Sequence, residues 1–172
     1  MYESYLAGIF DGDGTFGINK KNNWNQHSGP HSKKAKEYLG GIWDADGTFY
    51  VREDVVKVWV RYQPFASITL TDAKASKIFR LLEHEFEFKC VHKRFEGHDR
   101  YKTAYRWQLS SQKACDFAKE LAPYMIIKKE RAELLASFPK KWNGMTKDLR
   151  KEYTEKQEAI YQQMKALNKR GT

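Results

Sequence analysis

The sequence predicts an α+β fold in which helices cover one face of an antiparallel four-stranded sheet. Three observations support this prediction: a short motif that occurs twice, strand-like segments that come in pairs, and helical segments that separate and follow the pairs. The resulting order αββαββα, with further helices at the end, is typical of an open antiparallel sheet with helices on one side. With 172 residues, the chain has room for one domain and a short additional segment.

The motif that occurs twice is a short apolar segment that ends in two acids and a glycine. Residues 5–16 read YLAGIFDGDGTF and residues 38–49 read YLGGIWDADGTF, so nine of the twelve positions are identical. Similarity at this level indicates a duplicated unit. The stretch 17–34 is rich in Asn, Ser, Gly and Lys, which is typical of a linker. We therefore expect an extra motif copy with a polar linker in residues 1–35 and the main domain in residues 36–172.

Apolar periodicity predicts the elements of the main domain. The expected strands cover residues 48–60, 61–70, 89–95 and 100–110. In the second of these, residues alternate between an apolar face and a wetter face that carries Arg61 and Thr69. The expected helices cover residues 72–86, with Asp72 as the cap, 111–121, 125–138 and 146–169.

Composition restricts the partners and the compartment. The 31 Lys and Arg residues exceed the 22 Asp and Glu residues, and the formal net charge of +9 favours polyanionic partners. No apolar run is long enough for a membrane span or a signal peptide, so we expect no membrane partner and an intracellular location, in the cytoplasm or an organelle. Cys90 and Cys115 lie far apart, which argues against a disulfide framework or a cysteine zinc site.

The acids at the end of each motif copy suggest a metal site. The C-terminus of a helix already carries partial negative charge, so two carboxylates there are unfavourable unless a cation neutralises them. Gly8 in the first copy and Gly40 and Gly41 in the second allow another helix to approach closely. If the two copies pack side by side, their acids converge, and such hard oxygen ligands suit Mg²⁺. Paired acids with Mg²⁺ on a basic protein indicate nuclease chemistry.

The two segments 6–14 and 39–47 resemble the LAGLIDADG motif of homing endonucleases. The resemblance extends over residues 36 to about 170 and includes the segment 122–131, in which Lys128 matches a family lysine near the cleavage centre. The resemblance implies a site-specific endonuclease, active in intron homing, that depends on divalent metal and hydrolyses phosphodiester bonds in double-stranded DNA at a long recognition site.

The resemblance also implies which residues act in the site. The metal ligands would be the carboxylates of Asp13 and Asp46, together with the backbone carbonyls of Gly12 and Ala45. Mg²⁺ would be the cofactor, with Mn²⁺ or Ca²⁺ as substitutes. Lys128 would supply positive charge to the reacting phosphate, and Asp72 matches a polar residue that orders water. Asp11 and Asp44 would be structural.

In the family, DNA lies on the open face of the sheet. The candidate contacts are Tyr50, Arg52, Arg61, Gln63, Ser67, Thr69, His92, Arg94, Lys102, Arg106 and Gln108. The register of the strand that begins at Arg100 is ambiguous, so Trp107 could replace its neighbours.

Two questions stay open in the sequence. The first is whether the second motif forms a homodimer, which we favour, or whether the first motif packs on the second within one chain. The second is whether the protein cuts DNA. The alternatives are a DNA-binding protein or an RNA-splicing maturase that does not cut, and a nucleic-acid chaperone that acts through charge alone.

Overall fold

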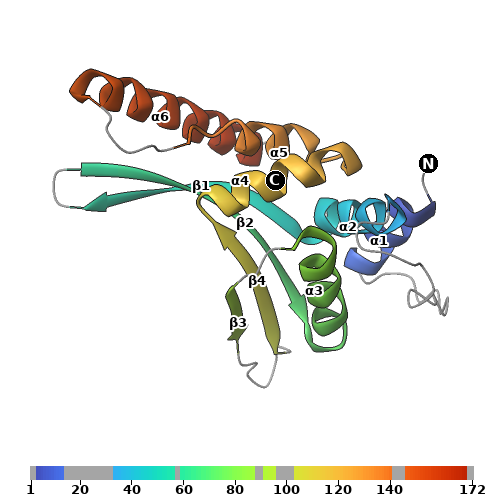
Figure 1. Ribbon diagram of the computed structural model, residues 1–172. Helices are drawn as coiled ribbons and strands as arrows, with labels where there is room; N and C mark the ends of the chain where they lie inside the picture. The colour runs from blue at the N-terminus through green and yellow to red at the C-terminus, as the bar shows by residue number, and fades with distance from the viewer. Residues whose placement is uncertain are drawn as a thin grey trace.

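The computed structural model describes residues 3–13, 33–56, 59–87, 91–95, 103–140 and 146–169. The helices are α1 (Glu3–Asp13), α2 (Lys33–Asp46), α3 (Asp72–Phe86), α4 (Gln112–Leu121), the 3₁₀ turn η2 (Ala122–Tyr124), α5 (Lys129–Ala136) and α6 (Lys147–Lys169). The strands are β1 (Gly47–Val56), β2 (Trp59–Thr71), β3 (Val91–Phe95) and β4 (Ala104–Ser110). They form one antiparallel sheet in the order β1-β2-β4-β3 (Figure 1). The predicted α+β class is confirmed.

The core lies between this sheet and the helices. The predicted alternation of β2 is confirmed, because Ala66, Ile68 and Leu70 are buried whereas Arg61 and Thr69 are exposed. At the centre, the rings of Trp43, Trp107 and Phe117 meet at centroid distances of 4.8 to 5.7 Å. The helix α6 lies along β1 and β2 (Figure 1), where Met164 is almost fully buried. The opposite face of β2 carries the exposed residues Arg61 and Thr69.

Some element bounds differ from the expected ones. The first strand was expected to run from 48 to 60, but β1 ends at Val56 and the next strand begins at Trp59. Asp72 was expected to cap a helix, but Thr71 occupies the cap position with extended backbone and Asp72 is the first helical residue. No helix in the described part of the chain combines the length and apolarity that a membrane span requires.

The helices α1 and α2 lie side by side (Figure 1). Gly8 packs against the backbone of Tyr38 and Ile42, and Gly41 packs in the same way against the equivalent residues of α1. A Cβ atom at either glycine would overlap with a backbone carbonyl of the other helix. Because the contacts are reciprocal, the two helices pack in register around a local two-fold axis. The colour of both helices lightens from right to left in Figure 1, so they run in parallel.

This arrangement bears on the expected homodimer formed by the second motif, which stays a prediction. In the structure, the face of α2 that would serve such a dimer is covered by α1 of the same chain. The physical reason is proximity, because a helix attached to the same chain has an effective concentration in the mM range, on the order of that of short flexible tethers. The intrachain pair is therefore the arrangement that the structure has.

Candidate metal and nucleic-acid site

Asp44 fastens two parts of the chain to α2. Its side chain is buried, and Oδ2 accepts hydrogen bonds from the Tyr5 hydroxyl at 2.5 Å and from the backbone N–H groups of Ile126 at 2.7 Å and Ile127 at 2.9 Å. Oδ1 accepts a further hydrogen bond from the backbone N–H of Lys128 at 2.8 Å. Four donors around one carboxylate agree with the structural role that was expected for this residue.

The same contacts explain why α5 starts later than expected. A helix was predicted from Met125, but α5 begins at Lys129. The backbone N–H groups of residues 126–128 point at Asp44, and this segment is not helical. Donation to a buried carboxylate competes with helix formation here and places Lys128 at the end of α2.

The hydroxyl of Tyr5 is held in its neutral form. Burial, together with the hydrogen bond to Asp44 and the charge of that carboxylate, raises the pKa of Tyr5 well above its ordinary value. A protonated phenol is required to donate this hydrogen bond. The contact between Tyr5 and Asp44 therefore joins α1 to α2 by a polar link in addition to the packing at the two glycines.

Lys128 caps the C-terminus of α2. Its Nζ donates to the carbonyls of Gly47 at 2.8 Å, Ala45 at 3.1 Å and Trp43 at 3.3 Å. Helix ends leave such carbonyls without partners inside the helix, and a cation there also interacts favourably with the helix dipole. The sequence predicted the position of Lys128 near the motif acids but missed this contact, because only the tertiary path of residues 125–128 creates it.

The two motif acids stand at the ends of the paired helices. Asp46 is the last residue of α2 and is half-buried, and Asp13 is the last residue of α1. Asp13 stands five residues beyond Gly8, and Asp46 stands five residues beyond Gly41. Both helix ends therefore lie about 7.5 Å past the glycine contact, on the same side. The side chain of Asp13 lies outside the described residues, as does that of Asp11.

The oxygen atoms at the end of α2 include some of the ligands that a hard cation prefers. Among the described side chains, no three His, Cys, Asp or Glu residues form a metal-binding group. The carbonyl of Ala45 accepts a hydrogen bond from an ammonium group, which shows that this end of α2 attracts positive charge. Together with the carboxylate of Asp46, this carbonyl is an oxygen donor of the kind that Mg²⁺ and Ca²⁺ prefer.

Asp72 lies at the same end of the sheet. The strand β1 begins at Gly47, directly after Asp46, and the register pairs Gly47 with Ile68 of β2. That strand ends three residues further on, and Asp72 follows as the first residue of α3. The backbone thus carries Asp72 toward the ends of the motif helices, whereas its side chain lies outside the described residues.

The open face of the sheet contains most of the predicted DNA contacts. The register pairs Arg52 with Gln63, Ser67 with Gln108, and Thr69 with Arg106 across neighbouring strands. Arg106 Nε donates to Thr69 Oγ1 at 3.1 Å, which places this pair on one surface. The expected residues that share this face are Tyr50, Arg52, Arg61, Gln63, Ser67, Thr69, Arg106 and Gln108.

Three of the expected DNA contacts have a different outcome. His92 pairs with the fully buried Trp107 and Arg94 pairs with Tyr105, so the register assigns both positions to the core side of the sheet. Lys93 takes the position beside Arg106 on the open face. The contact of His92 and Arg94 with DNA stays a prediction, because their side chains lie outside the described residues and one residue of register reverses the face of every position in a strand. Burial also excludes Trp107 as a surface contact, and Lys102 lies outside the described residues.

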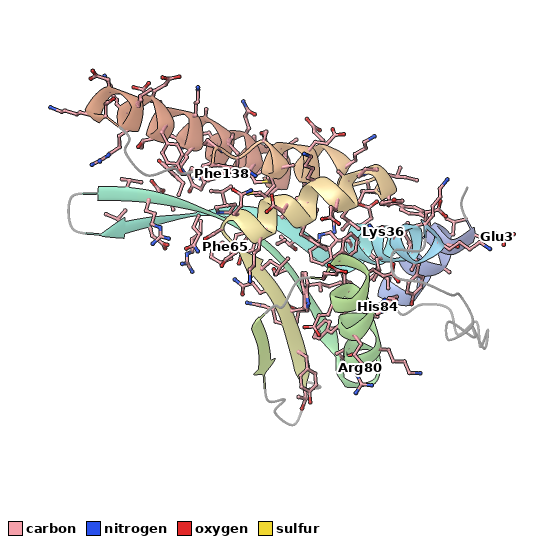
Figure 2. All side chains as sticks on the ribbon, in the orientation of Figure 1. Glu3, Lys36, Phe65, Arg80, His84 and Phe138 are labelled. Atoms are coloured by element: carbon pink, nitrogen blue, oxygen red, sulfur yellow. The ribbon has the colours of Figure 1, made fainter. Side chains whose placement is uncertain are left out.

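An aromatic cluster on the open face was missed by the sequence analysis. The ring of Tyr50 stacks on that of Phe65 at 5.1 Å, and the guanidinium of Arg52 lies 4.9 Å from the same ring. Figure 2 labels Phe65 on the sheet. Only 5% of Phe65 is exposed, although it belongs to the predicted wetter face. Arg52 also forms an ion pair with Asp54 at 2.8 Å. The sequence signal for this cluster is Phe65, an aromatic residue at a strand position whose neighbours on the same face are polar.

Comparison of the whole fold with solved structures finds a group of homing endonucleases. The homing endonuclease I-CvuI, in complex with the I-CreI target, has a TM-score of 0.59 at 12% identity, with 77% of this chain and 80% of that chain covered. The LAGLIDADG homing endonuclease I-GzeII, in complex with its DNA target, has a TM-score of 0.58 at 17% identity, with coverage of 73% and 43%. The group I intron-encoded endonuclease I-CeuI, complexed with DNA, has a TM-score of 0.54 at 12% identity, with coverage of 80% and 69%.

The fold of this chain is that of the LAGLIDADG homing endonucleases. The two motif copies that suggested this resemblance form the helix pair at one end of the sheet. The chain spans less than half the length of I-GzeII. No protein-family model matches the sequence, and no curated protein matches it significantly.

Proposed function

We propose that this protein is a divalent-metal-dependent endonuclease that binds double-stranded DNA on the open face of its sheet. Hydrolysis of the phosphodiester takes place at the ends of α1 and α2. The observation that carries the proposal is the parallel, in-register helix pair, because it brings the last residues of both motif copies, Asp13 and Asp46, to the same side.

Binding to DNA is supported by charge and by the composition of the open face. The net charge of +9 favours association with phosphate groups. Arg52, Gln63, Arg106 and Gln108 lie on one surface, and arginine and glutamine are suited to hydrogen bonds with base edges in the major groove. The solved relatives in fold named above are themselves complexes with DNA.

The metal would be held by Asp13 and Asp46, with the carbonyls of Gly12 and Ala45. A divalent cation bound there supplies activation of water and neutralises charge on the phosphate. The chain itself orients the site: Asp44 holds both helices and the segment before α5 in place, and Lys128 keeps a positive charge at the end of α2. In this proposal Asp72 assists by ordering water near the helix ends.

The test uses duplex DNA selected by binding. A randomised duplex library is enriched with the full chain in Ca²⁺, and the bound duplexes are then incubated with the chain in Mg²⁺. We expect Asp46→Asn to abolish cleavage and to leave affinity in Ca²⁺ within about threefold, since an exposed sheet surface and not the helix end supplies the DNA contacts. Asp148→Asn, a change of the same kind on the exposed start of α6, serves as the control.

Two results would contradict the proposal. If the Asp46→Asn protein cut as fast as the unchanged chain, the assigned ligand would be wrong. If no duplex were enriched over random sequence and affinity followed salt alone, the protein would be a charge-driven nucleic-acid binder.

A second candidate function is DNA or RNA binding without cleavage, as in an inactive relative or a splicing maturase. The observation that favours it is the contact between Lys128 and the Ala45 carbonyl, because an ammonium group already neutralises this end of α2 without a metal. In the same experiment, this candidate predicts enrichment of specific nucleic acid and no cleavage in Mg²⁺.

A further inference from the structure

We propose that Asp54 positions the guanidinium of Arg52 for contact with a guanine in the major groove, so that one base pair of the bound duplex is read by a group that is already oriented in the free protein. The inference rests on the proposed binding of double-stranded DNA to the open face of the sheet, and it does not depend on cleavage. In this assignment Arg52 determines specificity, and Asp54 is a positioning residue that acts through Arg52.

Both residues lie on the open face of β1. The register pairs Arg52 with Gln63 and Asp54 with Arg61, and these partners belong to the side of β2 that faces away from the core. Arg52 is the sixth residue of β1, which begins directly after α2. At about 3.3 Å per residue, it lies about 20 Å from the end of that helix. A change at Arg52 or Asp54 therefore leaves the candidate metal ligands untouched.

The carboxylate of Asp54 occupies one edge of the guanidinium. Its Oδ1 lies 2.8 Å from Arg52 Nε, and its Oδ2 accepts a hydrogen bond from Arg52 Nη2 at 3.0 Å. A guanidinium carries its five N–H groups in one plane, with one on Nε and two on each terminal nitrogen. The contact with Asp54 therefore does not use the outer edge, where Nη1 and Nη2 each direct one N–H in parallel.

An aromatic ring fixes the plane of the same guanidinium. The group lies 4.9 Å from the centroid of the Phe65 ring, and this ring also stacks on that of Tyr50. Because Phe65 is buried, its ring is a fixed support, whereas 55% of the Arg52 side chain is exposed. A long side chain that is held in this way loses less rotamer freedom when it binds. The outer edge of Arg52 is therefore both accessible and oriented.

Two parallel donors require two acceptors on the ligand. In the major groove, guanine presents two acceptors, N7 and O6, whereas adenine presents one acceptor and one donor, thymine one acceptor, and cytosine a donor. A phosphate group also offers two oxygens, but the carboxylate of Asp54 offsets the charge of Arg52 and repels an anion beside it. The arrangement therefore favours a guanine edge over the DNA backbone.

The experiment measures base preference during enrichment of a randomised duplex library with the full chain in Ca²⁺. The unchanged chain, Arg52→Lys and Asp54→Asn each enrich the same library, and the bound duplexes are sequenced. We expect one base pair at which the unchanged chain prefers guanine by about tenfold or more. Arg52→Lys should lose this preference, because an ammonium group lacks the planar pair of donors. Its preferences at the other base pairs should persist, which shows in the same sample that this variant folds and binds.

Asp54→Asn separates positioning from charge. The amide keeps the size of the side chain but removes the ionised acceptor that holds Arg52. We expect the guanine preference at the same base pair to fall by about threefold or more, with no loss of affinity for random duplex DNA. If Asp54 acted only through its charge, the substitution would raise affinity for all duplexes alike and keep the preference, and this result would overturn the inference. Arg80→Lys makes the matched exchange at an exposed position of α3 (Figure 2) and should keep every preference.

Failure of this inference can be distinguished from failure of the proposed function. If the unchanged chain enriches specific duplexes and Arg52→Lys changes no guanine preference, the assignment of Arg52 is wrong and the binding of DNA stands. A uniform loss of affinity across all sequences in Arg52→Lys would also overturn it, because this residue would then contact the backbone. If the unchanged chain enriches no sequence, the proposed site-specific binding of DNA fails, and the inference fails with it.

Discussion

Replacement of Asp44 by asparagine tests whether one carboxylate holds the helix pair and the lysine segment together. The substitution keeps the volume but turns one oxygen into an NH₂ group. If the amide oxygen takes the place of Oδ1, it still accepts the hydrogen bond from the Lys128 N–H. The NH₂ group then takes the place of Oδ2 and cannot accept from the three groups that donate there: the Tyr5 hydroxyl and the N–H groups of Ile126 and Ile127.

The expected loss follows from the number of donors that are left without an acceptor. A hydrogen bond to a charged group contributes about 1.5 to 3 kcal/mol, and removal of one partner from a buried charged arrangement costs about 3 to 5 kcal/mol. Because the three lost bonds share one acceptor, they do not add, and we expect a loss of about 4 kcal/mol in the free energy of unfolding. This is a large fraction of the total stability of a small domain.

Urea unfolding followed by tryptophan fluorescence measures this loss, since Trp43 and Trp107 are fully buried and report on the core. Asp54→Asn provides the matched control, because Asp54 pairs with Arg52 on the surface and its loss costs at most about 1 kcal/mol. If Asp44→Asn destabilised the protein no more than Asp54→Asn does, the reasoning about the buried carboxylate would be refuted.

Two further predictions concern the same helix ends. The pKa of Tyr5 is raised in the folded chain, so the stability that its hydroxyl contributes is complete below the ordinary value of 10.0 and is lost as the pH rises from there toward the folded pKa. Urea unfolding at a series of alkaline pH values should show this decline in the unchanged chain and a weaker one in Tyr5→Phe, and equal declines would contradict it. Lys128→Met removes the ammonium from two carbonyls of α2 and the carbonyl of Gly47 and should reduce stability by about 1 to 2 kcal/mol. Lys129→Met, at the next and exposed position, should change it by less than about 0.5 kcal/mol.

The local pattern of the sequence determined the fold class, the repeat and the faces of β2. Alternation with a period of two residues is a property of the strand itself, so it identified Ile68 and Leu70 as core residues and Thr69 as a surface residue before any partner was known. The motif acids at the ends of two helices were likewise visible as a pattern of residue types.

Only the tertiary structure determined which part of the chain each strand and each side chain contacts. The register between β3 and β4 pairs His92 with Trp107, since nothing within a short strand specifies which residue it pairs with. Likewise, the path of residues 125–128 turned Lys128 from a charged residue near the site into the cap of α2.

The same limit applies to the helix pair. Because α1 and α2 have nearly the same contact residues, the sequence is equally compatible with an intrachain pair and with a homodimer. Periodicity encodes which face of a helix is apolar, whereas the choice between two equivalent partners depends on which one the chain brings close. In this protein, the covalent connection gives α1 that advantage.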